Sequence, residues 1–195
     1  SPQMREVLLA CYPQCPPDKI LVLPWGNWHL TEAVDPAAVQ ALRSELGLPP
    51  DAQVILTLSR ISPEKGQDLL LESLLEWERS GGRASRPTSV VICGEAAFMQ
   101  GRRHMARLRE LAAQLKSIRV LFPGHVTGER KRAFFGLADV YVFPSRHESY
   151  GLTLMEALAA GCATVALETH GARSVMRSDF GHMVRHAREI GRAHV

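Results

Sequence analysis

The sequence predicts an α/β protein built on a doubly wound parallel sheet. Apolar runs of strand length alternate with helical patterns along most of the 195 residues. These runs are mostly continuous rather than alternating, as expected for strands whose two faces are both covered. Strands that alternate with helices in this way imply parallel pairing through right-handed crossovers.

Seven short segments are predicted to form the strands. In chain order the expected strands are residues 20–23, 54–58, 89–93, 119–122, 140–143, 163–166 and 181–184.

The helices are predicted from the patterns between these runs. Asp35 followed by Pro36 is a start signal, because it combines an N-cap with proline at the first helical position. Gly161 is a stop signal at the end of the last of them. The expected helices are residues 1–10, 37–46, 67–79, 103–116, 129–137 and 152–160.

Composition is that of an ordinary globular protein. Hydrophobic residues make up 46% and charged residues 22%, which excludes a disordered tail, a collagen-like repeat and a small disulfide scaffold. No window holds 18 uninterrupted apolar residues, and the first ten residues lack a signal-peptide core. We therefore expect a cytoplasmic protein.

Charge and cysteine content agree with this location. The net charge of +3 is too small to require nucleic acid, and the arginine-rich run 101–109 is interpreted as a solvated helix face. Cys11, Cys15, Cys93 and Cys162 are interpreted as buried thiols in a reducing compartment, with only the first two close enough in sequence to pair.

Both ends of the chain look cut. Residues 1–18 are interpreted as the end of a preceding domain and a linker, residues 19–184 as one domain, and residues 185–195 as a polar tail of helical composition. Helix 1–10 has no strand before it, and little chain is left to cover the sheet after residue 184. We expect a piece of a larger protein.

The loop after strand 54–58 is the first candidate site. Ligands of an open parallel sheet bind beyond the carboxyl ends of its strands. Arg60 and Lys65 lie there, with Gly66 at the start of a helix. Two cations suit a diphosphate and would neutralise it without a metal. A surface loop with ordinary charges explains the same residues equally well.

The loop after strand 140–143 is the strongest feature. It carries Glu148 and then Gly151, where a helix begins whose N-terminus favours an anion. Glu156 follows early in that helix and would suit sugar hydroxyls, as the acidic residue of a dinucleotide fold suits ribose. Ordinary helix charges remain the alternative.

Two further loops contain a glycine that permits close approach of a ligand. They carry Gly94 after strand 89–93, and Gly124 with His125 after strand 119–122. Neither is a dinucleotide fingerprint or a Walker loop. His182 and His186 lack the context of a zinc helix, so no metal site is predicted.

Taken together, these loops resemble the nucleotide-sugar-binding half of the retaining GT-B glycosyltransferases of family 4, also called glycosyltransferases group 1. The resemblance covers residues 20–184. It is carried by Glu148 and Glu156 with seven residues between them, by the Arg60/Lys65 pair, and by the turn Pro24-Trp25-Gly26. It implies a Rossmann-like domain that forms the C-terminal half of a two-domain fold.

The resemblance also implies roles for single residues. Arg60 and Lys65 would hold the donor diphosphate, Glu148 would face the transferred sugar, and Glu156 would bind the ribose hydroxyls. The first three of these would be catalytic. Further donor contacts would come from Gly94, His125, Val126, Ser149, Tyr150, Gly151 and Leu152.

The implied reaction is transfer of a sugar from a UDP-, GDP- or ADP-sugar with retention of anomeric configuration, without metal or cofactor. The acceptor would be a saccharide or lipid-linked glycan bound by an N-terminal domain absent from this chain, which alone would be inactive. The whole protein would be a cytoplasmic enzyme of polysaccharide or glycoconjugate biosynthesis, with room for peripheral contact at the inner face of the membrane and no role in nucleic-acid binding.

Three alternatives stay open on sequence grounds. A sugar-nucleotide epimerase has the same architecture, but the spacing of the two glutamates favours transfer. An oxidoreductase would need the glycine fingerprint that this chain lacks. A non-catalytic nucleotide-binding or scaffold domain is separated only by an activity assay.

Overall fold

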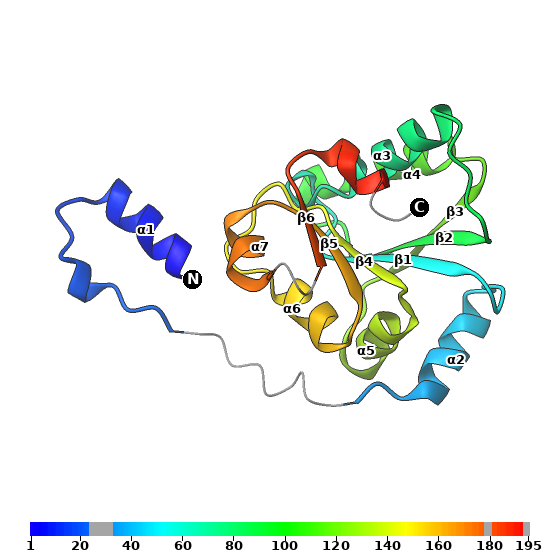
Figure 1. Ribbon diagram of the computed structural model, residues 1–195, viewed down its shortest axis with the longest axis horizontal. Helices are drawn as coiled ribbons and strands as arrows, with labels where there is room; N and C mark the ends of the chain where they lie inside the picture. The colour runs from blue at the N-terminus through cyan, green and yellow to red at the C-terminus, as the bar shows by residue number, and fades with distance from the viewer. Residues whose placement is uncertain (24–32, 178–180, 193–195) are drawn as a thin grey trace.

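The structure of the protein is a computed structural model that describes residues 1–23, 33–177 and 181–192. Its centre is a six-stranded parallel sheet in the order β3-β2-β1-β4-β5-β6 (Figure 1). The strands are β1 (Gln53–Leu58), β2 (Thr88–Cys93), β3 (Ile118–Gly124), β4 (Val140–Phe143), β5 (Ala163–Leu167) and β6 (Gly181–Val184). The doubly wound parallel sheet predicted from the sequence is confirmed.

Helices cover both faces of this sheet. One layer consists of α2 (Pro36–Glu45), α5 (Gly128–Leu137), α6 (Leu152–Ala159) and the short α7 (His170–Val175). The other layer consists of α3 (Gln67–Arg79), α4 (Phe98–Ala112) and the 3-10 helix η4 (Ala187–Arg192).

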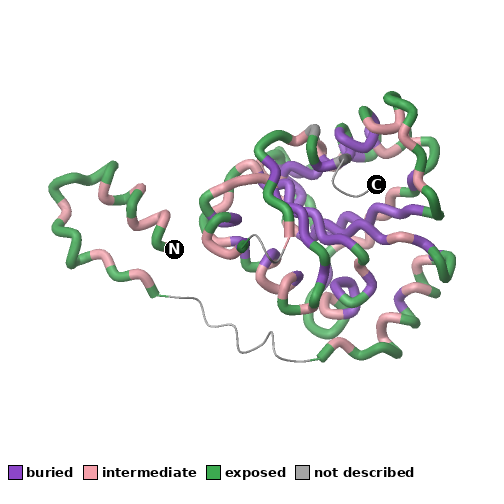
Figure 2. The backbone as a smooth tube through the Cα atoms, viewed as in Figure 1, coloured by how far each residue is buried: buried purple, intermediate pink, exposed green. Residues whose placement is uncertain are grey.

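Each layer forms its own apolar core with alternate residues of the strands. Leu56 and Tyr141 point into the first core, and Ile55 and Val142 point into the second. Strands β1, β2 and β4 are almost entirely buried (Figure 2). This double coverage is the physical reason that their sequences are continuous apolar runs.

The predicted helix signals act as expected. The Asp35 carboxylate accepts a hydrogen bond of 2.9 Å from the backbone N–H of Ala37, and Pro36 occupies the first turn. Gly161 follows α6 with a left-handed φ of 78°, which ends the helix.

The prediction that residues 20–23 form a strand is wrong. The structure leaves these residues outside any helix or strand, with Leu21 and Leu23 79% and 83% exposed. No described strand hydrogen-bonds to this run, and an apolar run becomes a strand only when a neighbour completes its ladder. The Pro24-Trp25-Gly26 turn lies outside the described residues.

The chain's ends also differ in detail from expectation. The predicted N-terminal helix is present as α1 (Pro2–Cys11) and lies against α7, where the Ser174 hydroxyl is 2.6 Å from Gln3 Oε1. A 3-10 turn, η1 (Pro17–Lys19), follows it. The helix expected at 103–116 begins earlier, at Phe98, and ends at Ala112. The predicted domain boundaries at residues 18 and 184 stay predictions.

The cysteines are all free thiols, and the prediction of burial holds for two of them. Cys93 and Cys162 are buried, and burial raises their pKa values to about 12 and about 11. Cys11 is exposed at the end of α1 and Cys15 is only partly covered, so the expectation of burial is wrong for these two thiols. No helix among the described residues is long and apolar enough to span a membrane.

Candidate donor-binding site

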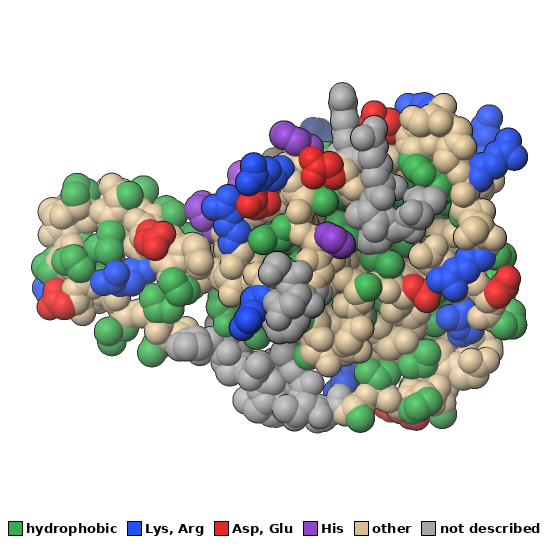
Figure 3. Space-filling view, viewed as in Figure 1, with side chains coloured by type: hydrophobic (Ala, Val, Ile, Leu, Met, Phe, Trp, Pro, Cys, Tyr) green, Lys and Arg blue, Asp and Glu red, His purple; other side chains and the backbone are tan. Residues whose placement is uncertain are grey.

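The candidate site lies at the carboxyl edge of the sheet, where the strand order reverses between β1 and β4. Two hollows of 380 and 360 Å³ meet there and share Ser59, Arg60 and Thr153. A wider hollow of 720 Å³ adjoins them on the side of α1 and α7 and also includes Arg60. Figure 3 shows basic, acidic and histidine side chains gathered over the α7 region of the surface.

The loop after β1 is shaped by Gly66. The turn η3 (Pro63–Lys65) ends at this glycine, whose φ of +67° lies in the left-handed region. A Cβ atom there would come within 2.0 Å of the Pro144 carbonyl oxygen at the end of β4. The glycine therefore allows the β1 loop to lie directly on the β4 loop.

This close approach brings two predicted catalytic residues together. Lys65 Nζ lies 2.6 Å from Glu148 Oε2, and the two side chains are only 14% and 17% exposed. Arg60 is more open: its side chain is 61% exposed and lies 3.6 Å from Glu64. The edge thus presents one shielded ion pair and one accessible guanidinium.

The Glu148 loop is held from behind by α7. The backbone N–H of Gly171 donates a hydrogen bond of 2.8 Å to the Glu148 carbonyl. A Cβ at Gly171 would lie 2.7 Å from Glu148 Cγ and 2.8 Å from the Tyr150 nitrogen, so only glycine fits. Gly171 was not identified from the sequence, because the short helix α7 was not predicted.

Glu156 occupies a different environment. It lies on α6 with Oε1 2.6 Å from Lys131 Nζ of α5, and its side chain is 11% exposed. The lining of the three hollows does not include Glu156. Lys131 was not identified from the sequence, since nothing in the local pattern of α5 distinguishes it from a solvated helix charge.

The remaining predicted donor residues divide between the two smaller hollows. Gly94, His125 and Val126 line the hollow of 380 Å³. Gly94 also has a packing role, because a Cβ there would lie 1.8 Å from the Ser59 carbonyl oxygen. The hollow of 360 Å³ is lined by Lys65, Glu148, Ser149, Tyr150, Gly151 and Leu152 together with the three shared residues.

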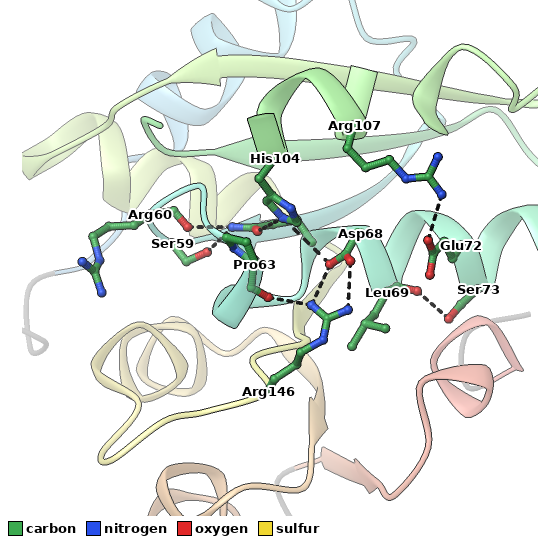
Figure 4. A network of polar contacts seen from close by, with 11 residues as sticks. Ser59, Arg60, Pro63, Asp68, Leu69, Glu72, Ser73, His104, Arg107 and Arg146 are labelled. Atoms are coloured by element: carbon green, nitrogen blue, oxygen red, sulfur yellow. Dashed lines mark hydrogen bonds and ion pairs between the residues drawn. The ribbon is translucent and has the colours of Figure 1, made fainter. Parts of the chain in front are cut away.

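A second ion pair, which the sequence did not reveal, fastens the two loops together. Arg146 donates two hydrogen bonds of 2.8 Å to the two carboxylate oxygens of Asp68 and one of 2.6 Å to the Pro63 carbonyl (Figure 4). Burial alone would raise the pKa of Asp68, but the hydrogen bonds and charge of Arg146 outweigh it and keep that pKa below its usual value. The β4 loop is thereby tied to the first turn of α3.

A buried amide lies next to this pair. Gln67 is fully buried, and its side-chain nitrogen donates to Ser59 Oγ at 2.8 Å and to the Arg60 carbonyl at 2.7 Å. Its oxygen lies 3.0 Å from His104 Nε2 of α4. Burial lowers the pKa of His104, against the opposing influence of Asp68.

Within the described residues, His, Cys, Asp and Glu side chains form no group of three that could hold a metal ion. The expectation of a metal-independent reaction stays a prediction.

The sequence of this chain matches one family model and several curated proteins. Residues 39–187 match the family described as "Glycosyl transferases group 1". The D-inositol 3-phosphate glycosyltransferase of Kineococcus radiotolerans is 34% identical over 165 residues, which are 84% of this chain and 37% of that protein. The protein of the same name from Streptomyces griseus is 34% identical over 166 residues, which are 84% of this chain and 35% of that protein.

Solved structures share the fold. A glycosyltransferase from Rickettsia africae superposes with a TM-score of 0.81 at 21% identity, covering 98% of this chain and 50% of that one. Anabaena HepE, solved in complex with UDP and glucose, gives a TM-score of 0.74 at 22% identity, covering 89% of this chain and 45% of that one.

The family match covers β1 to β6 and every loop of the candidate site, while the chain spans little more than a third of the length of the two curated relatives. This chain belongs to the glycosyl transferases group 1 family.

Proposed function

We propose that this chain is the donor-binding, C-terminal domain of a retaining glycosyltransferase of family 4. The observation that carries the proposal is the Lys65–Glu148 pair, held at 2.6 Å beside Arg60 where two hollows meet. The family match favours a transferase over the epimerase and the oxidoreductase.

Each of the two smaller hollows would bind a different part of a nucleotide sugar. The hollow of 380 Å³ would take the nucleoside against His125 and Val126, and the hollow of 360 Å³ would take the sugar beside Glu148. The diphosphate joins these parts, so it would cross the shared residues Ser59 and Arg60.

The charges of the site suit departure of a nucleoside diphosphate. As the bond between the sugar C1 and the phosphate oxygen breaks, negative charge grows on the phosphate, where Arg60 and Lys65 would stabilise it. The acceptor oxygen then bonds to C1 on the same face, and its proton passes to the departing phosphate. Glu148 Oε2 already accepts a hydrogen bond from Lys65 Nζ. The carboxylate would therefore accept a hydrogen bond from a sugar hydroxyl and would not attack C1.

The rest of the proposal concerns the whole protein. Its acceptor, a saccharide or lipid-linked glycan, would be bound by the N-terminal domain. The enzyme would act in the cytoplasm, with peripheral contact at the inner face of the membrane, and without a metal. UDP is the first nucleotide to test because the HepE structure contains it.

Calorimetric titration of the 195-residue chain with UDP, GDP and ADP, at low salt without added metal, tests the donor site. We expect one nucleotide to bind and Lys65→Ala to weaken it by ~tenfold or more, the value of a lost charge-assisted hydrogen bond. Arg102→Ala, on the exposed face of α4, is the matched control and should bind as the wild type does.

Three results would contradict the proposal. The first is equal affinity of the wild type and Lys65→Ala for the nucleotide. The second is unchanged turnover of the full-length enzyme carrying Arg60→Ala. The third is failure of the full-length protein to bind any nucleotide, in which case the scaffold alternative replaces the transferase.

A further inference from the structure

Gln67 fixes the hydrogen-bond roles of its neighbours. Its amide group is fully buried and contacts three polar atoms: Ser59 Oγ, the Arg60 carbonyl oxygen and His104 Nε2. A carbonyl oxygen only accepts hydrogen bonds, so the atom of Gln67 that lies 2.7 Å from the Arg60 carbonyl is the NH₂ nitrogen. The amide oxygen therefore faces His104, whose Nε2 must carry a hydrogen.

The hydrogen bonds of Gln67 also determine whether the Ser59 hydroxyl acts as a donor or an acceptor toward it. The two hydrogens on the Gln67 nitrogen are both used, one on the Arg60 carbonyl and one on Ser59 Oγ. Ser59 Oγ is therefore an acceptor toward Gln67, and its own proton must point elsewhere. Within residues 1–23, 33–177 and 181–192, no side chain or carbonyl accepts that proton.

The position of Ser59 shows where the proton is available. Ser59 lines both smaller hollows, next to Arg60, where they join. Its loop is fixed on the other side as well, by a hydrogen bond of 3.1 Å from its backbone N–H to the Cys93 carbonyl. The Ser59 hydroxyl, with its proton free to be donated, therefore lies where the two hollows join.

We propose that Ser59 is a further ligand of the donor diphosphate, and that Gln67 is a positioning residue that turns the Ser59 hydroxyl proton toward the phosphate. His104 completes the arrangement by holding the Gln67 oxygen, which keeps the amide from flipping. The inference rests on the proposed donor site and names one more contact within it.

Nucleotide titration of Ser59 variants is the primary test. Ser59→Ala should weaken UDP binding by ~tenfold, because a hydrogen bond to a charged group is lost, and Ser59→Thr should restore most of the affinity. Ser73→Ala is the matched control: this buried hydroxyl of α3 bonds to the Leu69 and Ala187 carbonyls, away from the hollows, and its loss should leave UDP binding unchanged.

The role of Gln67 is tested by reversing its polarity. In Gln67→Glu a carboxylate would accept from Ser59 and draw the proton out of the hollow, so UDP binding should fall as far as in Ser59→Ala. The double variant should bind no more weakly than Ser59→Ala alone. Gln67→Met, which keeps the volume and removes the donors, should show a smaller loss that likewise disappears in the Ser59→Ala background.

The outcomes separate this inference from the proposed function. If Lys65→Ala weakens UDP binding and Ser59→Ala does not, the Ser59 contact is wrong and the donor site stands. If the losses of UDP affinity in Ser59→Ala and in the Gln67 variants are fully additive, Gln67 does not act through Ser59 and the positioning role is wrong. Thermal unfolding curves must first show that each variant is folded. Failure of the wild type to bind UDP, GDP, ADP or inorganic pyrophosphate would overturn both proposals.

Discussion

Two lysine–glutamate pairs of equal length lie in different layers of this molecule. Lys65–Glu148 joins two loops at the carboxyl edge of the sheet, and Lys131–Glu156 joins two helices below that edge; both measure 2.6 Å. The loop pair lines two of the hollows, whereas the helix pair borders none of the three. Two pairs of equal length therefore differ in their access to a ligand, which only the loop pair has among these three hollows.

The two pairs also differ in what holds them. Helices α5 and α6 are anchored by their own backbone hydrogen bonds and by buried residues such as Phe135 and Leu154. The loops after β1 and β4 lack the regular backbone hydrogen bonds of a helix or sheet. Their positions depend on close backbone contacts at Gly66 and Gly171 and on the Arg146–Asp68 pair. The loop pair should thus be easier to disrupt without unfolding the sheet.

The largest effect is expected for Gly66→Ala. The new Cβ would collide with the Pro144 carbonyl and occupy a left-handed φ, so the loops must separate. We expect the free energy of unfolding to fall by ~3 kcal/mol or more and nucleotide binding to be lost. Chemical denaturation and calorimetry measure the two effects.

Gly81→Ala is the matched control for this change. Gly81 follows the other end of α3 with a φ of +88° and has nothing within 4 Å of the added Cβ. It should cost only the ~1 kcal/mol of the left-handed backbone and leave binding intact. If Gly66→Ala and Gly81→Ala change stability and nucleotide binding equally, the close contact of Gly66 with the Pro144 carbonyl is not what holds the Lys65–Glu148 pair in place.

Substitutions of the two glutamates are expected to affect the binding of different ligands. Glu156→Gln should weaken UDP binding by ~tenfold only if Glu156, which lines none of the three hollows, reaches the ribose hydroxyls as the family resemblance implies. Glu148→Gln should leave UDP affinity unchanged or higher, since it removes a negative charge beside the phosphate, and should weaken only the nucleotide sugar.

Parallel titrations of both variants with UDP and with the corresponding UDP-sugar measure this separation. If Glu148→Gln loses affinity for both ligands alike, Glu148 does not face the sugar. If Glu156→Gln binds UDP normally, the pair on the helices is structural only.

The smallest effect is expected from the pH dependence of the buried network. Burial lowers the pKa of His104 from its ordinary value of 6.5, so the unfolded chain binds the proton more readily than the folded chain. The contribution to stability is full above pH 6.5 and is lost as the pH falls toward the folded-state pKa, with a slope of at most ~1.4 kcal/mol per pH unit.

His104→Gln removes this titration and retains an N–H donor toward Gln67. Denaturation of both proteins between about pH 7.5 and pH 5 should show that the stability of the wild type falls more steeply than that of the variant. If the free energy of unfolding changes with pH equally in the wild type and in the variant, protonation of His104 does not destabilise the folded protein.

Local sequence patterns predict the six strands of the sheet, most of the helices and the edge on which the candidate site lies. The apolar runs at 54–58 and 140–143, the helix at 67–79 and the cap at Asp35 all depend on local patterns, and the structure contains them. The placement of Arg60, Lys65 and Glu148 in loops after strands follows from those same patterns, because ligand-facing loops of a parallel sheet share one edge.

Which of these residues meet depends on strand order and on packing between distant parts of the chain. Lys65 and Glu148 are 83 positions apart and touch because β1 lies beside β4, and the same neighbour relation joins Arg146 to Asp68. The buried amide of Gln67 looks like any polar helix residue in the sequence, and its role appears only when α4 supplies His104. Residues 20–23 show the converse, since an apolar run alone makes no strand. Periodicity reports which face of an element is buried; the partner across that face is set by strand order and packing, which no local pattern encodes.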